Sequence, residues 1–322
     1  MTMLANHSTG KTSGHTTASA AQRLRQSFAA VRVSFTWLGV RKTLNADQKS
    51  QAAEAFGAEG QYLSAAKKLL DTRHPAFQAV NAIRGRIQAY WRGSSLPFPE
   101  PGVRLIKQDD IEPLNTRMQE FRGELAEAVG ALDRQYAELR ETARERLGSL
   151  YNSSDYPPNL AGLFEVTWDF PSVEPPEYLL RLNPRLYQEE KDRISARFNE
   201  AVQMAEQAFA GELAKLVDHL VERLSAGPDG QHKVFRDSAI TNLNEFFERF
   251  RGLNLGSSAE LDRLVETARK AIQGVEPQAI RDSGGLRQHL ATQLSGVAAT
   301  LDQFLVDAPR RRILRPAKAE AP

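Results

Sequence analysis

The segment from Ala5 to Thr12 is the first part of the sequence whose residue types could do chemistry. It reads Ala-Asn-His-Ser-Thr-Gly-Lys-Thr and fits a relaxed phosphate-binding loop in which Ala5 replaces the first glycine. Such a loop needs a buried strand before it and a helix after it, because backbone N–H groups and a helix N-terminus must converge on the phosphates. Only Met1 to Leu4 precede this segment. We therefore expect no nucleotide hydrolysis here.

The side chains that usually carry catalysis or bind metals are scattered along the sequence. The chain has six histidines and no cysteine, which excludes a disulfide, a thiolate nucleophile, an iron–sulfur cluster and a cysteine-bound zinc ion. No two histidines have the spacing of three or four residues that places two imidazoles on one helical face. No serine lies in a G-x-S-x-G motif. These patterns predict no catalytic, metal-binding or cofactor-binding residues, and an enzyme with an unrecognised site stays open as a third class.

Three phenylalanines near the C-terminal end of the sequence are the candidates for a partner-binding surface. Phe246, Phe247 and Phe250 span more than one narrow stripe of a predicted helix. A helix with so wide an apolar arc either contacts several neighbours in the core or presents part of its face to a partner. The sequence leaves both interpretations open.

Basic residues gather near both ends of the chain. No acidic residue precedes Asp47, and the stretch from residue 307 onward is also basic, so the part between them is acidic although the whole chain carries +2. Basic ends can bind nucleic acid, because each neutralised phosphate releases counterions. They can equally be solvated ends that keep the chain soluble. The candidate nucleic-acid contacts are Arg23, Arg25, Arg41, Lys42, Arg310, Arg311 and Arg312.

Aromatic residues flank some of these cations and admit two interpretations. They could form a stacking platform for bases next to Arg32, Arg41 and Lys42. Their alternation along two predicted strands favours a sheet that packs one face on helices. The aromatic residues are Phe35, Trp37, Trp168 and Phe170.

Two strands and several short helices are predicted around these residues. The segments Val31 to Trp37 and Phe164 to Phe170 alternate with period two, which is typical of a strand with one buried face. Residues 96–102 are predicted to be an extended or turning connector. They contain three prolines, and each proline fixes its own φ and disfavours helical geometry at the residue before it. Helices are predicted near 46–56, 61–71 and 75–92.

Two long helices are the strongest prediction from the pattern. From Ile111 to Leu150, and again from Pro184 to Leu224, apolar residues recur at steps of three and four, so each helix carries one continuous apolar stripe. Because the two helices are similar in length, we predict that they pair as a long antiparallel helical hairpin, a coiled-coil arm. The same stripes could pair between chains, so the oligomeric state stays open.

The predicted fold class is mainly α with a small β component, in which the hairpin joins a small α+β base and a C-terminal helical bundle. No run of residues approaches the roughly 18 apolar residues of a membrane span, and the absence of cysteine suits a reducing compartment, so we expect a cytoplasmic protein. The predicted divisions are a disordered basic tail at 1–20, the α+β region at 21–108, the hairpin at 109–225 with a strand-bearing insert at 152–182, the bundle at 226–306, and a second disordered basic tail at 307–322.

The stretch from Phe35 to Leu44 reads Phe-Thr-Trp-Leu-Gly-Val-Arg-Lys-Thr-Leu. It resembles the Trp-x-Gly-x-Arg/Lys-Lys-x-Leu segment of a bacterial family, the domain of unknown function 3150. The order of the predicted helices and strands that follow is also similar. The resemblance implies a component of phages and mobile genetic elements, often found beside MoxR/CobS-like AAA+ ATPases and proteins with von Willebrand factor A domains. It implies no catalytic residues.

These observations together predict a non-enzymatic adaptor or regulatory scaffold of a bacterial mobile element. Such a protein would act through protein–protein contacts, with an AAA+ ATPase and a von Willebrand factor A protein as partners by resemblance, and its hairpin would be a rigid lever. The alternative is a nucleic-acid-binding accessory protein whose basic ends contact phosphates.

Overall fold

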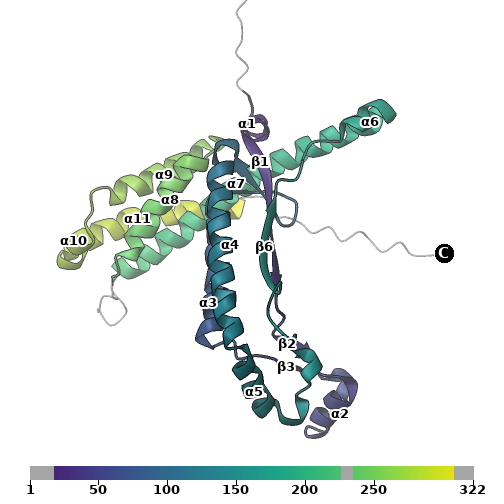
Figure 1. Ribbon diagram of the computed structural model, residues 1–322. Helices are drawn as coiled ribbons and strands as arrows, with labels where there is room; N and C mark the ends of the chain where they lie inside the picture. The colour runs from purple at the N-terminus through teal and green to yellow at the C-terminus, as the bar shows by residue number, and fades with distance from the viewer. Residues whose placement is uncertain (1–17, 226–234, 308–322) are drawn as a thin grey trace, which may run out of the picture.

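The computed structural model describes residues 18–225 and 235–307 of the 322-residue chain (Figure 1). Within these ranges the chain is mainly helical with a small antiparallel sheet, which confirms the predicted fold class at this level. The first helix, α1 (Ala20–Ser27), begins at a reciprocal capping box between Ser19 and Gln22. The predictions for the segment from Ala5 to Thr12, for Arg310 to Arg312 and for most of both tails lie outside the described residues.

A four-stranded antiparallel sheet lies between the two halves of the molecule. Its strand order is β4-β5-β1-β6. The two predicted strands are confirmed and pair with each other, with Val33 opposite Trp168 and Phe35 opposite Val166. The strands are β1 (Phe28–Trp37), β4 (Leu96–Pro97), β5 (Val103–Lys107) and β6 (Phe164–Asp169).

The alternation along β1 explains how different helices cover the two faces of this sheet. Successive side chains of a strand point to opposite faces. Val31 and Val33 belong to a core shared with α3 (Pro75–Gly93) and α4 (Ile111–Arg134), whereas Phe28 and Ala30 belong to a second core shared with α7 (Pro184–Leu224). Farther along the strand only the first face is covered, because Ser34 is exposed. The sheet is therefore the layer at which two hydrophobic cores meet.

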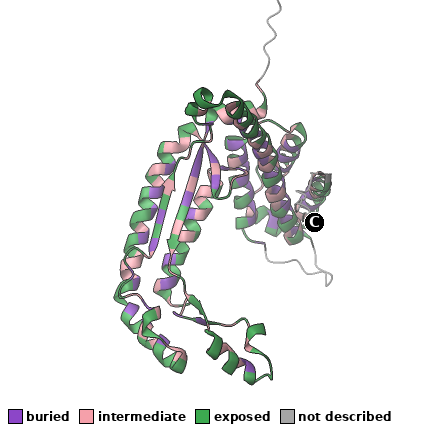
Figure 2. Cartoon of the chain, turned by 90° about the vertical axis from the view of Figure 1, so that its right-hand side faces the viewer, coloured by how far each residue is buried: buried purple, intermediate pink, exposed green. Residues whose placement is uncertain are grey.

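Helices α3 (Pro75–Gly93) and α4 (Ile111–Arg134) run side by side over the first face of the sheet (Figure 1). We call these helices and the sheet the sheet lobe. Figure 2 shows α4 with buried residues on one side and exposed residues on the other. The buried residues of α4 recur at steps of three and four, as predicted: Leu114, Met118, Phe121 and Leu125.

The predicted single helix over 111–150 is broken near its middle. Gln135 leaves helical geometry, with φ −102° and ψ 0°, and the chain continues as α5 (Tyr136–Leu147). Beside the break, the carboxylate of Asp133 accepts a hydrogen bond of 2.9 Å from the backbone N–H of Leu160. This bond holds the loop that follows α5 against the end of α4.

Short elements form the far end of the sheet lobe, which we call the tip. The predicted helix at 61–71 is wrong, because this stretch contains a 3₁₀ turn (Gly60–Tyr62) and β3. Its lysines and leucines favour a helix only weakly, and the pairing of β3 with β2 together with the burial of Lys67 overrides that preference. The elements of the tip are β2 (Arg41–Thr43), α2 (Ala46–Glu54), β3 (Ala66–Lys68), α5 and the loop 148–155.

The long helix α7 (Pro184–Leu224) begins and ends where the sequence predicts. Asn183 caps it by accepting a hydrogen bond from the backbone N–H of Leu186. Its main neighbours are α11, α1 and α8, so the bundle that the sequence predicts over 226–306 also contains α7. The remaining helices of the bundle are α8 (Ser238–Leu253), α9 (Ala259–Ile272), α10 (Pro277–Asp282) and α11 (Gly284–Asp307).

The predicted pairing of 111–150 with 184–224 as a hairpin is wrong, although both apolar stripes exist. The buried residues of α4 and α5 belong to the core of the sheet lobe, and those of α7 belong to the core of the bundle. Apolar spacing shows which face of a helix is buried but not which element covers it. The stretch 109–225, which was predicted to be one unit, is therefore shared between two parts of the molecule: α4 and α5 belong to the sheet lobe, and α7 belongs to the bundle.

Candidate functional site

The three phenylalanines predicted as a partner surface lie inside the bundle. Phe246, Phe247 and Phe250 are 1%, 5% and 6% exposed. The rings of Phe246 and Phe250 contact the ring of Phe209 on α7 edge to face, with centroids 6.2 and 5.1 Å away. The wide apolar arc arises because α8 packs on both α7 and α9. These side chains are core residues, which corrects the predicted interface.

Arg23 and Arg25, two of the predicted nucleic-acid contacts, hold α1 in place. Arg23 donates a hydrogen bond of 2.5 Å to the backbone oxygen of Leu255. Arg25 donates through Nε to the carboxylate of Glu174 at 2.7 Å. This hydrogen bond lowers the pKa of Glu174 and raises the pKa of Arg25. Both cations therefore serve contacts within the chain.

Arg41 and Lys42 lie at the opposite end of β1 from α1. The ten residues of β1 separate the two pairs of cations by roughly 30 Å at the rise of an extended strand. Lys42 is paired with Asp155 in the tip, whereas Arg41 is exposed. The described cations among the predicted contacts therefore lie on separate parts of the molecule.

The aromatic residues of the two long strands pack within the sheet lobe. The guanidinium of Arg84 lies over the rings of Phe35 and Trp37, 5.3 and 4.9 Å from their centroids. The indole N–H of Trp168 donates a hydrogen bond of 3.1 Å to an asparagine side chain of α4. Phe170, which follows β6, is 42% exposed. This packing favours the sheet interpretation over a stacking platform for bases.

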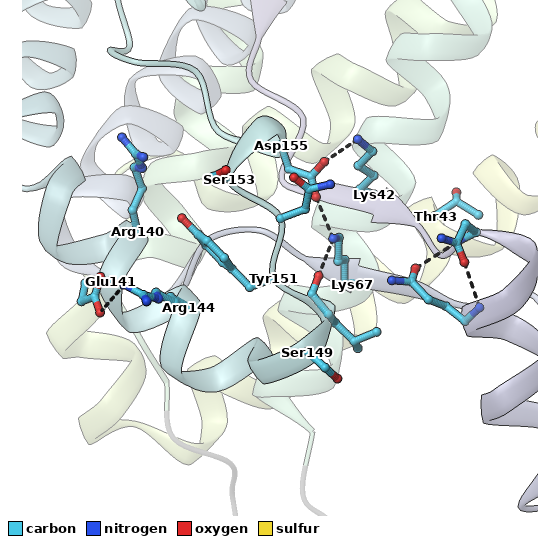
Figure 3. Close-up of a pocket in the computed structure, with 14 residues that line it drawn as sticks. Lys42, Thr43, Lys67, Arg140, Glu141, Arg144, Ser149, Tyr151, Ser153 and Asp155 are labelled. Carbon is cyan, nitrogen blue, oxygen red and sulfur yellow. Dashed lines mark hydrogen bonds and ion pairs between the residues drawn. The ribbon is translucent and has the colours of Figure 1, made fainter.

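A polar hollow of about 860 Å³ lies in the tip, where four segments of the chain meet (Figure 3). Its walls come from β2 with the start of α2, from β3, from α5 and from the loop 148–155. Four cations and two carboxylates line it, which leaves two positive charges in excess. The charged lining residues are Lys42, Lys67, Arg140, Glu141, Arg144 and Asp155.

Asp155 lies between two lysines on one side of this hollow (Figure 3). Its side chain is 1% exposed, and one carboxylate oxygen is 2.7 Å from the Nζ of Lys67 while the other pairs with Lys42. The buried Lys67 also donates a hydrogen bond of 2.6 Å to the backbone oxygen of Leu150. Hydrogen bonds from Lys42 and Lys67 lower the pKa of Asp155, so it is ionised at neutral pH.

Arg140 and Arg144 lie one helical turn apart on α5, on the other side of the hollow (Figure 3). Arg144 is 3.6 Å from the carboxylate of Glu141, and both side chains are largely exposed, so this ion pair is weak. The guanidinium of Arg140 lies 5.7 Å from the ring centroid of Tyr136. Its Nε is buried and has no hydrogen-bond partner. The ring of Tyr151 lies between these arginines and Lys67 (Figure 3).

The chemistry of this hollow suits the binding of negative charge. Asp155 is held ionised by two ammonium groups, which makes it a poor proton donor near neutral pH. The lysines and arginines supply charged hydrogen-bond donors, which bind oxyanions well. In residues 18–225 and 235–307 there is no cluster of three or more histidine, aspartate and glutamate residues that could hold a metal ion.

Sequence reasoning missed the residues of this hollow apart from Lys42. One available signal was the spacing of Arg140 and Arg144, which places both side chains on one face of the predicted helix. No signal linked Lys67 to Asp155, because β3 was predicted as helix. Their contact depends on the pairing of β3 with β2 and on the path of the loop after α5.

A second exposed feature is the α6–α7 end, comprising α6 (Glu177–Leu182) and the first turns of α7 up to residue 193. It projects from the bundle (Figure 1), and α6 folds back along α7. The first buried residue of α7 is Ile194, so about 15 Å of helix precedes it. Four large apolar side chains of this end are exposed: Tyr178 (55%), Leu180 (53%), Leu182 (77%) and Leu186 (37%).

Comparisons of the chain with protein-family models, curated proteins and solved structures found no match. The resemblance to the domain of unknown function 3150 therefore stays a prediction from the segment Phe35 to Leu44. Among the helices that the structure describes, none has the length and apolar character needed to cross a membrane.

Proposed function

We propose that this protein is a non-enzymatic adaptor that binds a protein partner through the α6–α7 end. The observation that carries the proposal is the exposure of four large apolar side chains on an element that projects from the bundle. Several large exposed apolar side chains on one projecting element are a sign of a protein-binding surface, because covering them releases water from apolar area.

The charged residues of the α6–α7 end support this proposal. Arg185 pairs with Glu189 at 3.1 Å, and Arg193 pairs with Glu190 at 2.6 Å. These ion pairs lie along one short helical segment and keep its polar side hydrated. Leu182, which precedes them, is 77% exposed. A helical end of this kind suits a partner with an apolar groove that receives a few leucine and tyrosine anchors.

The partner that we propose is an AAA+ ATPase of the same mobile element, acting together with a von Willebrand factor A protein. This choice rests on the resemblance of residues 35–44 to the domain of unknown function 3150, and it includes a cytoplasmic location for the complex. The exposed apolar side chains of the α6–α7 end support this end as the location of the contact. The rigid part that presents this place is the bundle around α7, in place of the hairpin expected from the sequence.

The experiment is a capture assay with the tagged full chain in an extract of its native host, followed by binding measurements with the purified partner. We expect wild-type protein to retain an AAA+ ATPase. The double variant Leu180→Ser/Leu182→Ser should weaken binding at least about tenfold, since each lost apolar anchor contributes roughly 1 kcal/mol or more. The double variant should keep its thermal unfolding temperature, because both side chains are exposed.

The matched control is Phe56→Ser, which removes an apolar side chain that is 84% exposed and lies just after α2, far from the α6–α7 end. It should bind as wild type does. Equal binding by wild type and the double variant would refute the α6–α7 end as the contact. Recovery of nucleic acid with no protein partner would favour the accessory-protein alternative, which the pairing of Arg23, Arg25 and Lys42 within the chain weakens. Self-association that the double variant abolishes would identify a second copy as the occupant.

A further inference from the structure

We propose that the polar hollow of the tip binds a small phosphate-bearing ligand with at least two negative charges. The hollow is distinct from the α6–α7 end, because it is built from β2, β3, α5 and the loop 148–155 at the far end of the sheet lobe (Figures 1 and 3). The proposal is therefore independent of the proposed adaptor contact.

Charge is the first argument. Lys42, Lys67, Arg140 and Arg144 face a common space, and only Glu141 and Asp155 oppose them there. Each carboxylate is already committed, Asp155 to the two lysines and Glu141 to Arg144. The two positive charges in excess match a ligand with two negative charges. A hollow with charge of one sign attracts ions of the opposite sign.

Unmet hydrogen-bonding capacity is the second argument. Arg140 is held on α5 next to the ring of Tyr136, and its Nε is buried without a hydrogen-bond partner. This Nε is closed to solvent, so the donors that Arg140 offers to a ligand in the hollow are the two terminal nitrogens of its guanidinium. A guanidinium offers donors in a planar fork that matches phosphate oxygens.

Shape and lining are the third argument. A volume of about 860 Å³ lies within the range of about 300–1,000 Å³ typical of small-molecule sites. The walls supply hydroxyl and amide groups from Thr43, Asn45, Asn152, Ser149 and Ser153. These groups can donate to the outer oxygens of a phosphate while the cations carry the charge.

Asp155 has a positioning role in this site. By pairing with both lysines it fixes Lys42 of β2 and Lys67 of β3 at one wall, while the arginines of α5 lie on the other side of the Tyr151 ring (Figure 3). A phosphate that contacts both walls would join the β2–β3 pair to α5. Binding should therefore raise the thermal unfolding temperature of the protein.

The test is isothermal titration calorimetry of the full chain with inorganic pyrophosphate, with ADP and with citrate, at low salt. We expect pyrophosphate and ADP to bind, with an affinity that falls as salt rises. Citrate should bind at least about tenfold more weakly, because each of its carboxylates has two acceptor oxygens and one charge, whereas a phosphate group has more oxygens and more charge. Tighter binding of ADP than of pyrophosphate would identify a nucleotide as the source of the phosphate. Equal binding would identify inorganic phosphate groups.

The decisive variants are Arg140→Gln and Arg144→Gln, with Arg146→Gln as the matched control. Arg146 lies on the same helix and does not line the hollow. The first two should weaken pyrophosphate binding about tenfold or more, and the control should change it less than about threefold. No binding of either phosphate probe at millimolar concentration, binding that neither variant changes, or citrate binding equal to that of pyrophosphate would each overturn the proposal.

Discussion

Buried charge distinguishes Asp155 from the other acidic residues of the tip. Its carboxylate is almost fully enclosed and serves two lysines, one of which is buried as well. Charges removed from water are tolerated when they are paired and hydrogen-bonded, and removing one partner leaves an expensive unpaired charge. The position of Lys67, and with it one wall of the hollow, therefore depends on this residue.

We predict that Asp155→Asn lowers the free energy of unfolding by about 2 kcal/mol at neutral pH, because it leaves Lys67 buried without its counter-charge. The matched control is Asp169→Asn, which removes an exposed ion pair with Arg32 and should change stability by less than about 1 kcal/mol. Urea denaturation measures both values. Equal effects of the two substitutions would contradict the account of this pair.

The same carboxylate predicts a pH dependence. The pKa of Asp155 lies below its usual value of about 3.9 in the folded protein, so the pair stabilises the fold above that pH. This contribution is lost as the pH falls through the folded-state pKa. Between pH 5 and pH 2, wild-type protein should therefore lose more stability than Asp155→Asn does. Parallel losses in both proteins would show that Asp155 is not the titrating group.

At the scale of elements, the sequence predicts which segments are helices or strands better than it predicts how they pair. The alternation from Val31 to Trp37 and the cap at Asn183 correctly identified β1 and the start of α7. The break at Gln135 went unpredicted because the apolar spacing continues through it into α5. The lysines of β3 favour a helix locally, and the pairing of β3 with β2 overrides this preference. The missed residues share one cause, since long-range pairing carries no local signature.

A double-mutant cycle tests the corrected pairing of the long helices. Leu125 of α4 and Leu213 of α7 are both buried but belong to different cores. Each substitution to alanine should cost about 3 kcal/mol, and the two effects should add to within about 0.5 kcal/mol. Urea denaturation of the four proteins gives the interaction energy.

Phe209 and Phe250 are the control pair for this cycle, because their rings contact each other at a centroid distance of 5.1 Å. Their alanine substitutions should interact by about 0.5 kcal/mol or more. Strong coupling between Leu125 and Leu213 would support the antiparallel hairpin and refute the assignment of α7 to the bundle.

At the scale of the whole molecule, the chain has a two-faced sheet with a separate hydrophobic core on each side (Figures 1 and 2). The tip with its cationic hollow lies at the far end of the sheet lobe, and the α6–α7 end projects from the bundle. The two candidate binding regions therefore belong to different parts of one molecule. This separation suits an adaptor that responds to a small anion at one place and holds a protein at another.

Photo-crosslinking in the native host tests the protein contact most directly. A photoreactive phenylalanine analogue replaces Tyr178 in the α6–α7 end or, as the control, the exposed Arg73 beside α3. We predict a discrete crosslinked protein from position 178 and none from position 73. Absence of a protein crosslink from position 178, or the same product from both positions, would contradict the proposal that this end binds a protein partner.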